Sequence, residues 1–275
     1  MTDTLTKIAA LLRHAESTKV EAERETYMAK AQGLATLAAI DLAEARAYVP
    51  AHERTEKPTV EQIWIANAAT PKKGLATYVS LFMAIGKAND LRFTIAQNSR
   101  YVNVFGFPSD IETTKAIYAS VVVQMVASSD AYIHSGSYKT ERVWTSRKDA
   151  WGTPQYGYYP VHGSTARISF QDSYAVTIGR RLSQARADAI KAREAIKPVG
   201  AAALPAPLPP EPSTSTVLVL KAKAEEVNSF YDKNNNARGS WKGGSSSHRC
   251  SLSAAAGQHA ATRADLGRRR AVGAA

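Results

Sequence analysis

Residues 91–126 read LRFTIAQNSRYVNVFGFPSDIETTKAIYASVVVQMV, and this stretch decides the fold. Apolar and polar residues alternate over Leu91–Gln97 and again over Arg100–Phe107, which indicates two strands of a β-hairpin. From Ser109 onward the apolar residues recur at helical spacing, and Glu112 predicts a capping box with Ser109. A hairpin followed by a helix predicts an α+β fold in which a small antiparallel sheet packs with helices.

The segments on either side extend this pattern. Residues 74–88 place their apolar side chains on one helical face, and residues 169–196 do the same over a longer stretch. Val60–Ala66 alternates and could form a further strand. Residues 131–166 show no periodicity and are rich in aromatic and charged side chains, so we expect an irregular segment there. The α+β core is therefore predicted over residues 60–198.

The first 50 residues predict a separate helical hairpin. Apolar residues recur at helical spacing from Leu5 to Ala15 and again from Tyr27 to Ala38. Thr18 and Glu21 between them have the spacing of a capping box, in which each side chain bonds the other residue's backbone N–H. Two helices joined so tightly form an antiparallel pair.

The same opening residues resemble a known family. The elements are Lys7-Ile8, Leu11-Leu12, Ala15-Glu16-Ser17-Thr18, Glu21-Ala22-Glu23, Lys30-Ala31-Gln32 and Leu34. They resemble the bacterial and phage domain of unknown function 2786 (DUF2786), over residues 5–40. Val104–Phe107 and Arg167–Phe170 also look like the region that follows this domain in relatives. The resemblance implies a bacterial origin, with actinobacteria and their phages in first place, but it implies no activity and carries over no catalytic residue.

The C-terminal part has a different composition. Five prolines fall between Ala201 and Thr216, which predicts an extended linker over residues 199–216. Residues 217–275 are predicted to be a basic, partly disordered region. Within it, Gly257, Ala261 and Ala264 form a small-residue face suited to close helix packing. The arginines at 263 and 268–270 predict either an arm on nucleic acid or a disordered basic tail.

Charge and composition narrow the class of protein. The net charge is +11, and residues 131–275 hold 21 basic and 10 acidic side chains, so the excess lies in that half. This asymmetry predicts a polyanionic partner, of which nucleic acid is the first candidate. The alternative is that the basic side chains only keep the protein soluble. The single cysteine excludes an internal disulfide and any zinc site of several cysteines. No apolar run reaches the roughly 18 residues of a membrane span, so we expect a cytoplasmic protein. We also expect that it holds no metal ion or other cofactor.

Residues 138–167 hold the candidate binding site. Cations and aromatic rings alternate there, a combination that suits single-stranded nucleic acid, because cations pair with phosphates and rings stack on bases. The alternative is a loop whose aromatic side chains pack on the core. The predicted nucleic-acid-binding residues are Arg142, Trp144, Arg147, Lys148, Arg167 and Arg180.

Two other functions remain open. A hydrolase-type enzyme would place its site within residues 131–172, with His134, His162 and Asp172 as the candidates. No HExxH motif, glycine-rich phosphate loop or closely spaced ligand pair supports that hypothesis. A structural or host-interaction protein is the third possibility. The leading prediction is a non-enzymatic, nucleic-acid-associated protein with weak sequence specificity, since no recognition-helix or finger signature is present.

Overall fold

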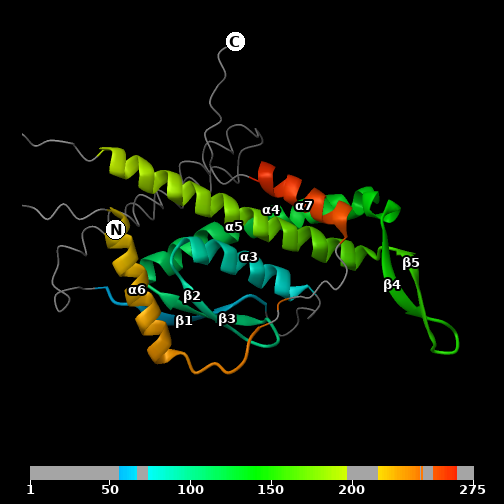
Figure 1. Cartoon of the computed structure of the whole chain (residues 1–275), viewed down its shortest axis with the longest axis horizontal. Helices are drawn as coiled ribbons and strands as arrows, with labels where there is room; N and C mark the ends of the chain where they lie inside the picture. Colours follow the sequence, from blue (N-terminus) through cyan, green and yellow to red (C-terminus); the bar gives the residue numbers. More distant parts are fainter. Residues whose placement is uncertain (1–55, 67–73, 197–215, 242, 244–249, 265–275) are drawn as a thin grey trace, which may run out of the picture.

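The computed structural model describes residues 56–66, 74–196, 216–241, 243 and 250–264 (Figure 1). The predicted N-terminal hairpin with Thr18, the linker before Thr216 and the arginines at 268–270 lie outside these residues. Over the described residues, helices and two small antiparallel sheets alternate along the chain, which is the predicted α+β class. The elements are β1 Thr59–Trp64, α3 Leu75–Ala88, β2 Arg92–Ile95, β3 Tyr101–Gly106, α4 Pro108–Ser135, the 3-10 turn η1 Ser137–Thr140, β4 Arg142–Lys148, β5 Pro154–Pro160, α5 Gly163–Ile196, α6 Thr216–Asn234 and α7 Ser251–Arg263.

The first sheet has the order β1-β3-β2, and all its pairs are antiparallel. Val102 and Val104 of β3 are fully buried against Val79 and Phe82 of α3. The opposite face of β3 meets α6, where the ring of Phe105 lies 5.0 Å from that of Tyr231 and 6.4 Å from that of Phe230. Strand β3 is thus covered on both sides: Val102 and Val104 face α3, and Phe105 faces α6.

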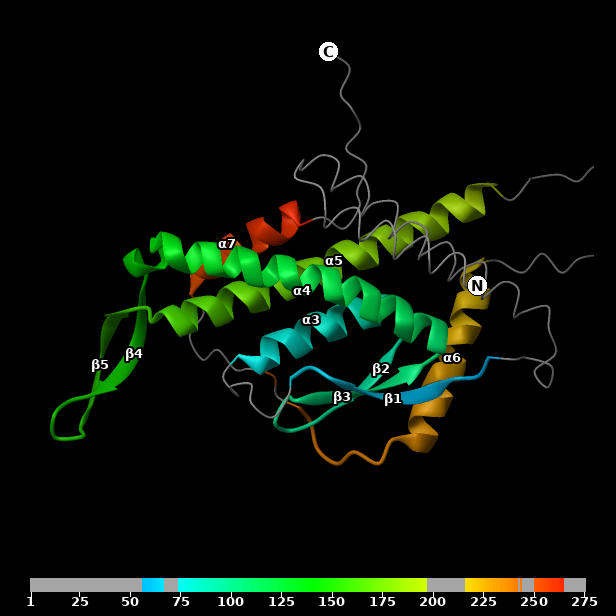
Figure 2. The ribbon, with the colours of Figure 1, turned by 180° about the vertical axis from the view of Figure 1, so that it is seen from behind.

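A layer of helices packs over this sheet (Figures 1 and 2). Helix α5 lies at its centre and contacts α3, α4 and α7. Tyr174, Ile178 and Leu182 of α5 are buried with Val121 and Met125 of α4. These residues form the apolar stripes predicted for the two helices, so that prediction is confirmed.

The predicted capping box at Ser109 is wrong. Helix α4 begins one residue earlier, at Pro108, and Phe107 is its N-cap without a side-chain hydrogen bond. Proline suits this first position because its fixed φ is helical and its missing N–H needs no partner. The backbone N–H of Ser109 donates instead to Glu56 Oε1 at 2.8 Å.

Two further boundaries differ from the prediction. Residues 142–160, expected to be irregular, form the two-stranded β4–β5 sheet. Helix α5 begins at Gly163, six residues before the predicted start at Ser169. His162 explains the earlier start, because its ring Nδ1 accepts from the Ser164 N–H at 3.2 Å and its carbonyl accepts from Thr165 and Ala166. A histidine in this role is absent from the usual capping signatures.

Helix α4 is long and apolar enough to cross a membrane, by length and composition alone. The core helix of a globular protein passes the same test. Its polar side chains have partners within the fold: Asp110 pairs with Lys223 at 2.8 Å, and Lys115 pairs with Glu61 at 2.5 Å. These ion pairs and its contacts with α3 and α5 indicate a core helix.

Candidate nucleic-acid interface

The β4–β5 hairpin projects from the end of the molecule where α4 ends and α5 begins (Figures 1 and 2). Its seven pairs run from Arg142 opposite Pro160 to Lys148 opposite Pro154. At the usual rise of a strand, this stem is about 20 Å long. The two strands form a sheet of their own, so the hairpin is a thin arm attached at one end.

The register sorts the side chains of the arm into two faces, because directly paired residues of an antiparallel ladder share a face. Every residue of one face is exposed, and we name it the open face. The open face consists of Arg142, Trp144, Ser146 and Lys148 on β4 with Pro154, Tyr156, Tyr158 and Pro160 on β5.

Three aromatic rings lie on the open face. Trp144 is 58% exposed, Tyr156 68% and Tyr158 65%. Trp144 and Tyr158 are directly paired, and their rings meet edge to face with centroids 5.2 Å apart. This pair stabilises the arm, but it leaves most of each ring available for contact. The alternative in which these aromatic side chains pack on the core is therefore wrong.

The reverse face of the arm is partly covered. Tyr159 and Val143 are half-buried there, and the Arg147 guanidinium lies over the Tyr159 ring at 4.7 Å from its centroid. The same guanidinium donates to the carbonyl oxygen of Pro160 at 3.3 Å. Arg147 therefore points away from Trp144, although it lies only three residues further along the chain.

The root of the arm is fixed to α7. The buried carboxylate of Glu141 accepts hydrogen bonds from the backbone N–H groups of Leu252 at 2.9 Å and Ser253 at 3.3 Å. The hydroxyls of Ser251 and Ser253 donate to the same carboxylate. Glu141 thus caps the N-terminus of α7, where free N–H groups and the helix dipole favour a negative charge.

The tip of the arm is a closed turn between Asp149 and Thr153. The Asp149 Oδ1 atom accepts from the N–H groups of Trp151 and Thr153, both at 2.9 Å. The bond from Thr153, with a second from the Gln155 side chain, holds the pKa of the Asp149 carboxyl below its ordinary value. Trp151 is 91% exposed at this tip.

The predicted site residues do not form one cluster. Arg142, Trp144 and Lys148 share the open face, whereas Arg147 lies on the reverse face. Arg167 forms an ion pair with Asp130 of α4. Arg180 is exposed on α5, seventeen residues after Gly163, which places it about 25 Å along the helix.

Tyr156, Tyr158 and Trp151 were left out of the predicted site set. The signal for them was present, since RVWTSRK and PQYGYYP are two seven-residue runs separated by a short segment with Gly152. Such spacing is typical of a hairpin. Counting alternate residues would then have placed both tyrosines beside Trp144.

The histidine and acid candidates do not converge. His134 Nδ1 bonds the Asp130 carbonyl oxygen at 2.8 Å, and His162 caps α5. Asp172 lies nine residues beyond Gly163, about 13 Å along α5 from that cap. Burial raises the pKa of Asp172 to about 6, whereas the ring nitrogens of His134 and His162 bond Asp130 and Ser164.

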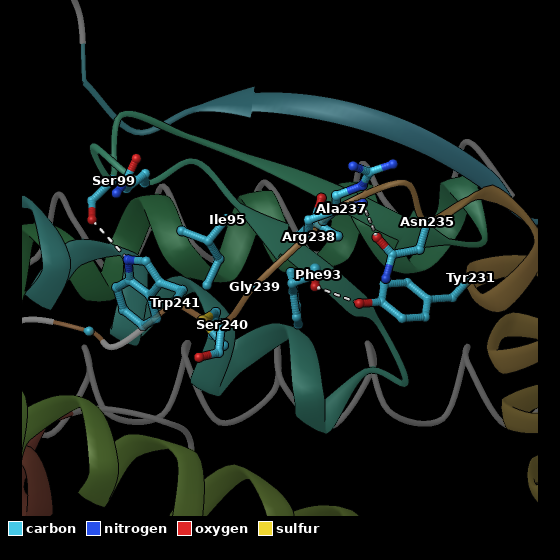
Figure 3. A pocket seen from close by; sticks show the side chains of 14 residues that line it. Phe93, Ile95, Ser99, Tyr231, Asn235, Ala237, Arg238, Gly239, Ser240 and Trp241 are labelled. Carbon is cyan, nitrogen blue, oxygen red and sulfur yellow. Dashed lines mark hydrogen bonds between the residues drawn. The ribbon is translucent and has the colours of Figure 1, made fainter.

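A pocket of about 860 Å³ lies between the edge strand β2 and residues 231–243 (Figure 3). The Trp241 indole N–H donates to Ser99 Oγ at 3.0 Å, and the Tyr231 hydroxyl donates to the Phe93 carbonyl at 3.4 Å. Among the described residues that line it, Arg238 is the charged one, and none is a carboxylate, histidine or cysteine. This lining offers no general acid–base pair for hydrolysis. In the described part of the chain, no group of three histidine, cysteine or acidic side chains could hold a metal ion.

Comparison with known proteins gives one match. Residues 3–42 match the family described as "Protein of unknown function (DUF2786)". The predicted resemblance over residues 5–40 is confirmed at this level, and the match lies outside the described residues. No curated protein and no solved structure matches the chain.

Proposed function

We propose that this protein binds nucleic acid through the open face of the β4–β5 arm and has no catalytic activity of its own. The observation that supports the proposal is the exposed face that carries Trp144, Tyr156 and Tyr158 between Arg142 and Lys148. A globular protein gains no core stability from three rings held in this position. Such rings are suited to a ligand with flat, apolar surfaces and a negative backbone.

The chemistry follows from the spacing on this face. Arg142 and Lys148 stand six residues apart on one strand, so about 20 Å of phosphate backbone lies within their reach. Base stacking on the rings between them tolerates any sequence, because every base has a π-face. The protein would therefore bind single strands with weak sequence preference.

A titration of a fluorescent single strand of about 12 nucleotides tests the proposal. Replacing Arg142 and Lys148 by glutamine should weaken binding and reduce the salt slope of log K by about 1.4, since each neutralised phosphate of a single strand contributes about 0.7. The matched control replaces Arg180 and Lys191, two exposed cations of α5, by glutamine. The control variant loses the same two positive charges, but its salt slope of log K should equal that of the native protein. Equal loss in both variants would show that net charge, and not the arm, attracts the ligand.

The aromatic contribution needs its own variant. Trp144→Ala should weaken single-strand binding by about 1–3 kcal/mol, the usual worth of one stacked base. Trp144→Phe keeps a ring on the open face and should retain most of the affinity. Because Trp144 also pairs with Tyr158, thermal melting must show that the arm is still folded.

Three finer expectations go with this proposal, of which the origin rests on the family resemblance alone. They are a cytoplasmic location, an actinobacterial or phage origin and a helical hairpin at the N-terminus. A structural or host-interaction role is the second candidate, because exposed tyrosine and tryptophan also suit protein interfaces. Failure of every nucleic-acid titration, together with capture of one defined protein that the Trp144→Ala variant fails to capture, would favour that role. The hydrolase hypothesis has less support, since its candidate residues lie apart.

A further inference from the structure

The tip of the arm holds Trp151 in a rigid turn. Besides the three hydrogen bonds to its carboxylate, Asp149 donates its N–H to the Thr153 carbonyl and accepts the Gly152 N–H at its own carbonyl, each at 3.0 Å. Gly152 has φ +81°, a left-handed conformation that glycine adopts without strain. The backbone on both sides of Trp151 is therefore fixed before any ligand binds.

The indole itself contributes nothing to this turn. It is 91% exposed, and no aromatic or cation–π contact with the described residues involves it. A large ring on a rigid backbone loses little conformational entropy when it becomes buried in a partner. The arm thus presents an aromatic wedge at its end, beyond the last pair of the stem, Lys148 and Pro154.

We propose that Trp151 inserts between bases of duplex nucleic acid where stacking is already interrupted, as at an unpaired base. This inference rests on the proposed function and names its substrate class, a duplex with a local defect beside a single strand. Lys148 is exposed next to the tip, so it can contact a phosphate that flanks the inserted ring. Strands of a sheet lie about 4.8 Å apart, and a two-stranded ribbon fits the major groove of about 12 Å.

A defect is the favoured site for a physical reason. Insertion of an apolar side chain requires that a base step be unstacked, and this costs a few kcal/mol in a perfect duplex. At an unpaired or mismatched base most of that cost is already absent. The wedge therefore selects damaged or branched duplex over perfect duplex, whereas the open face binds single strands.

The experiment compares three probes: a perfect duplex, the same duplex with one unpaired 2-aminopurine, and the single strand. The native protein should bind the defective duplex about 5- to 140-fold more tightly than the perfect one, the range of one stacked base. Insertion should quench the 2-aminopurine fluorescence. Trp151→Ala should abolish both the preference and the quenching, while its affinity for the single strand stays within about twofold. Trp151→Phe should recover part of the preference.

Trp144→Ala is the matched control, since it removes an indole from the open face and not from the tip. It should lose single-strand affinity and keep the preference for the defect. Two results would overturn the insertion of Trp151 and leave the proposed function intact. In one, Trp151→Ala keeps the preference for the defective duplex. In the other, the native protein binds single strands but does not prefer the defective duplex. If the native protein binds none of the three probes, both the proposed function and the insertion of Trp151 are wrong. Binding to phosphatidylserine vesicles that requires Trp151, without binding to any probe, would reassign the tip to membranes.

Discussion

The carboxyl group of Asp172 is half-buried on α5, and burial raises its pKa to about 6. The folded state therefore holds this proton more strongly than the unfolded state does. Stability should rise as the pH falls from 7 towards 4, because the ionised form is unfavourable in the folded protein. Above pH 6 the carboxyl is ionised in both states, so the folded protein bears the whole free-energy cost of the buried charge.

Asp172→Asn removes the cost without changing the shape of the side chain. We expect the free energy of unfolding at pH 7 to increase by about 1 kcal/mol, a value reduced for the solvent that still reaches the group. At pH 5 the native carboxyl is largely protonated, so the difference should shrink. Urea unfolding at both pH values measures it, and an equal difference at the two would show that ionisation of Asp172 is not the cause.

At the scale of elements, α7 is held at both ends by long-range contacts. Glu141 caps its N-terminus, and the Arg181 guanidinium donates to the carbonyl oxygens of Ala261 and Ala264 at its C-terminus. Each charge has the sign that the helix dipole favours at its end. Between them Gly257 lies against the backbone of Phe170, where an added Cβ would stand 2.1 Å from the carbonyl oxygen.

Glu141→Ala should loosen this helix selectively. The variant leaves the N–H groups of Leu252 and Ser253 without the carboxylate, and we expect a loss of about 2–4 kcal/mol. Glu141→Gln keeps one acceptor oxygen and should lose less. Hydrogen exchange of the α7 amides gives the readout. Unchanged exchange in Glu141→Ala would show that the cap is not needed, and that packing at Gly257 and the Arg181 contacts suffice to position the helix.

How far the sequence predicts the fold depends on the range of each contact. The β2–β3 hairpin and the faces of α4 and α5 depend on local periodicity, and they were predicted. So was the close packing of Gly257 and Ala261. The partners of α6 and α7 could not be predicted, because Asp110 pairs with Lys223 across 113 residues and Glu141 reaches Ser251 across 110. Of the open face, Arg142, Trp144 and Lys148 were predicted. Tyr156 and Tyr158 were missed, because residues 131–166 were expected to be irregular and the pairing of β4 with β5 was not recognised.

At the scale of the whole molecule, α6 and α7 complete the core that the earlier elements begin. Lys223 of α6 is buried in its ion pair with Asp110, and Ala261 of α7 is fully buried among residues of α4 and α5. Removal of residues 201–275 would therefore expose apolar surface and leave the buried Asp110 carboxylate without its cation. Such a truncation cannot separate the role of the C-terminal charges from loss of folding, and surface variants such as Lys148→Gln are the better test.

Cleavage of the chain before α6 tests directly whether α6 and α7 are part of the core. A protease site inserted after Pro205, within the predicted linker, allows cleavage of the folded protein into two pieces. We expect residues 206–275 to remain bound to the rest during gel filtration, because α6 and α7 are held by buried contacts and not by the linker. Separation of the pieces under native conditions would show that the C-terminal part is an independent unit.

Gly257→Leu supplies the variant that should release the C-terminal piece. The larger side chain meets the backbone of Phe170, which cannot move aside without displacing α5, so α7 should not dock. Ala255→Leu is the matched control, since Ala255 lies on the exposed face of the same helix. After cleavage, the Ala255→Leu protein should elute as one complex, whereas the Gly257→Leu protein should elute as two separate pieces. Co-elution of both would mean that α6 alone retains the piece, and adding Lys223→Ala should then separate it.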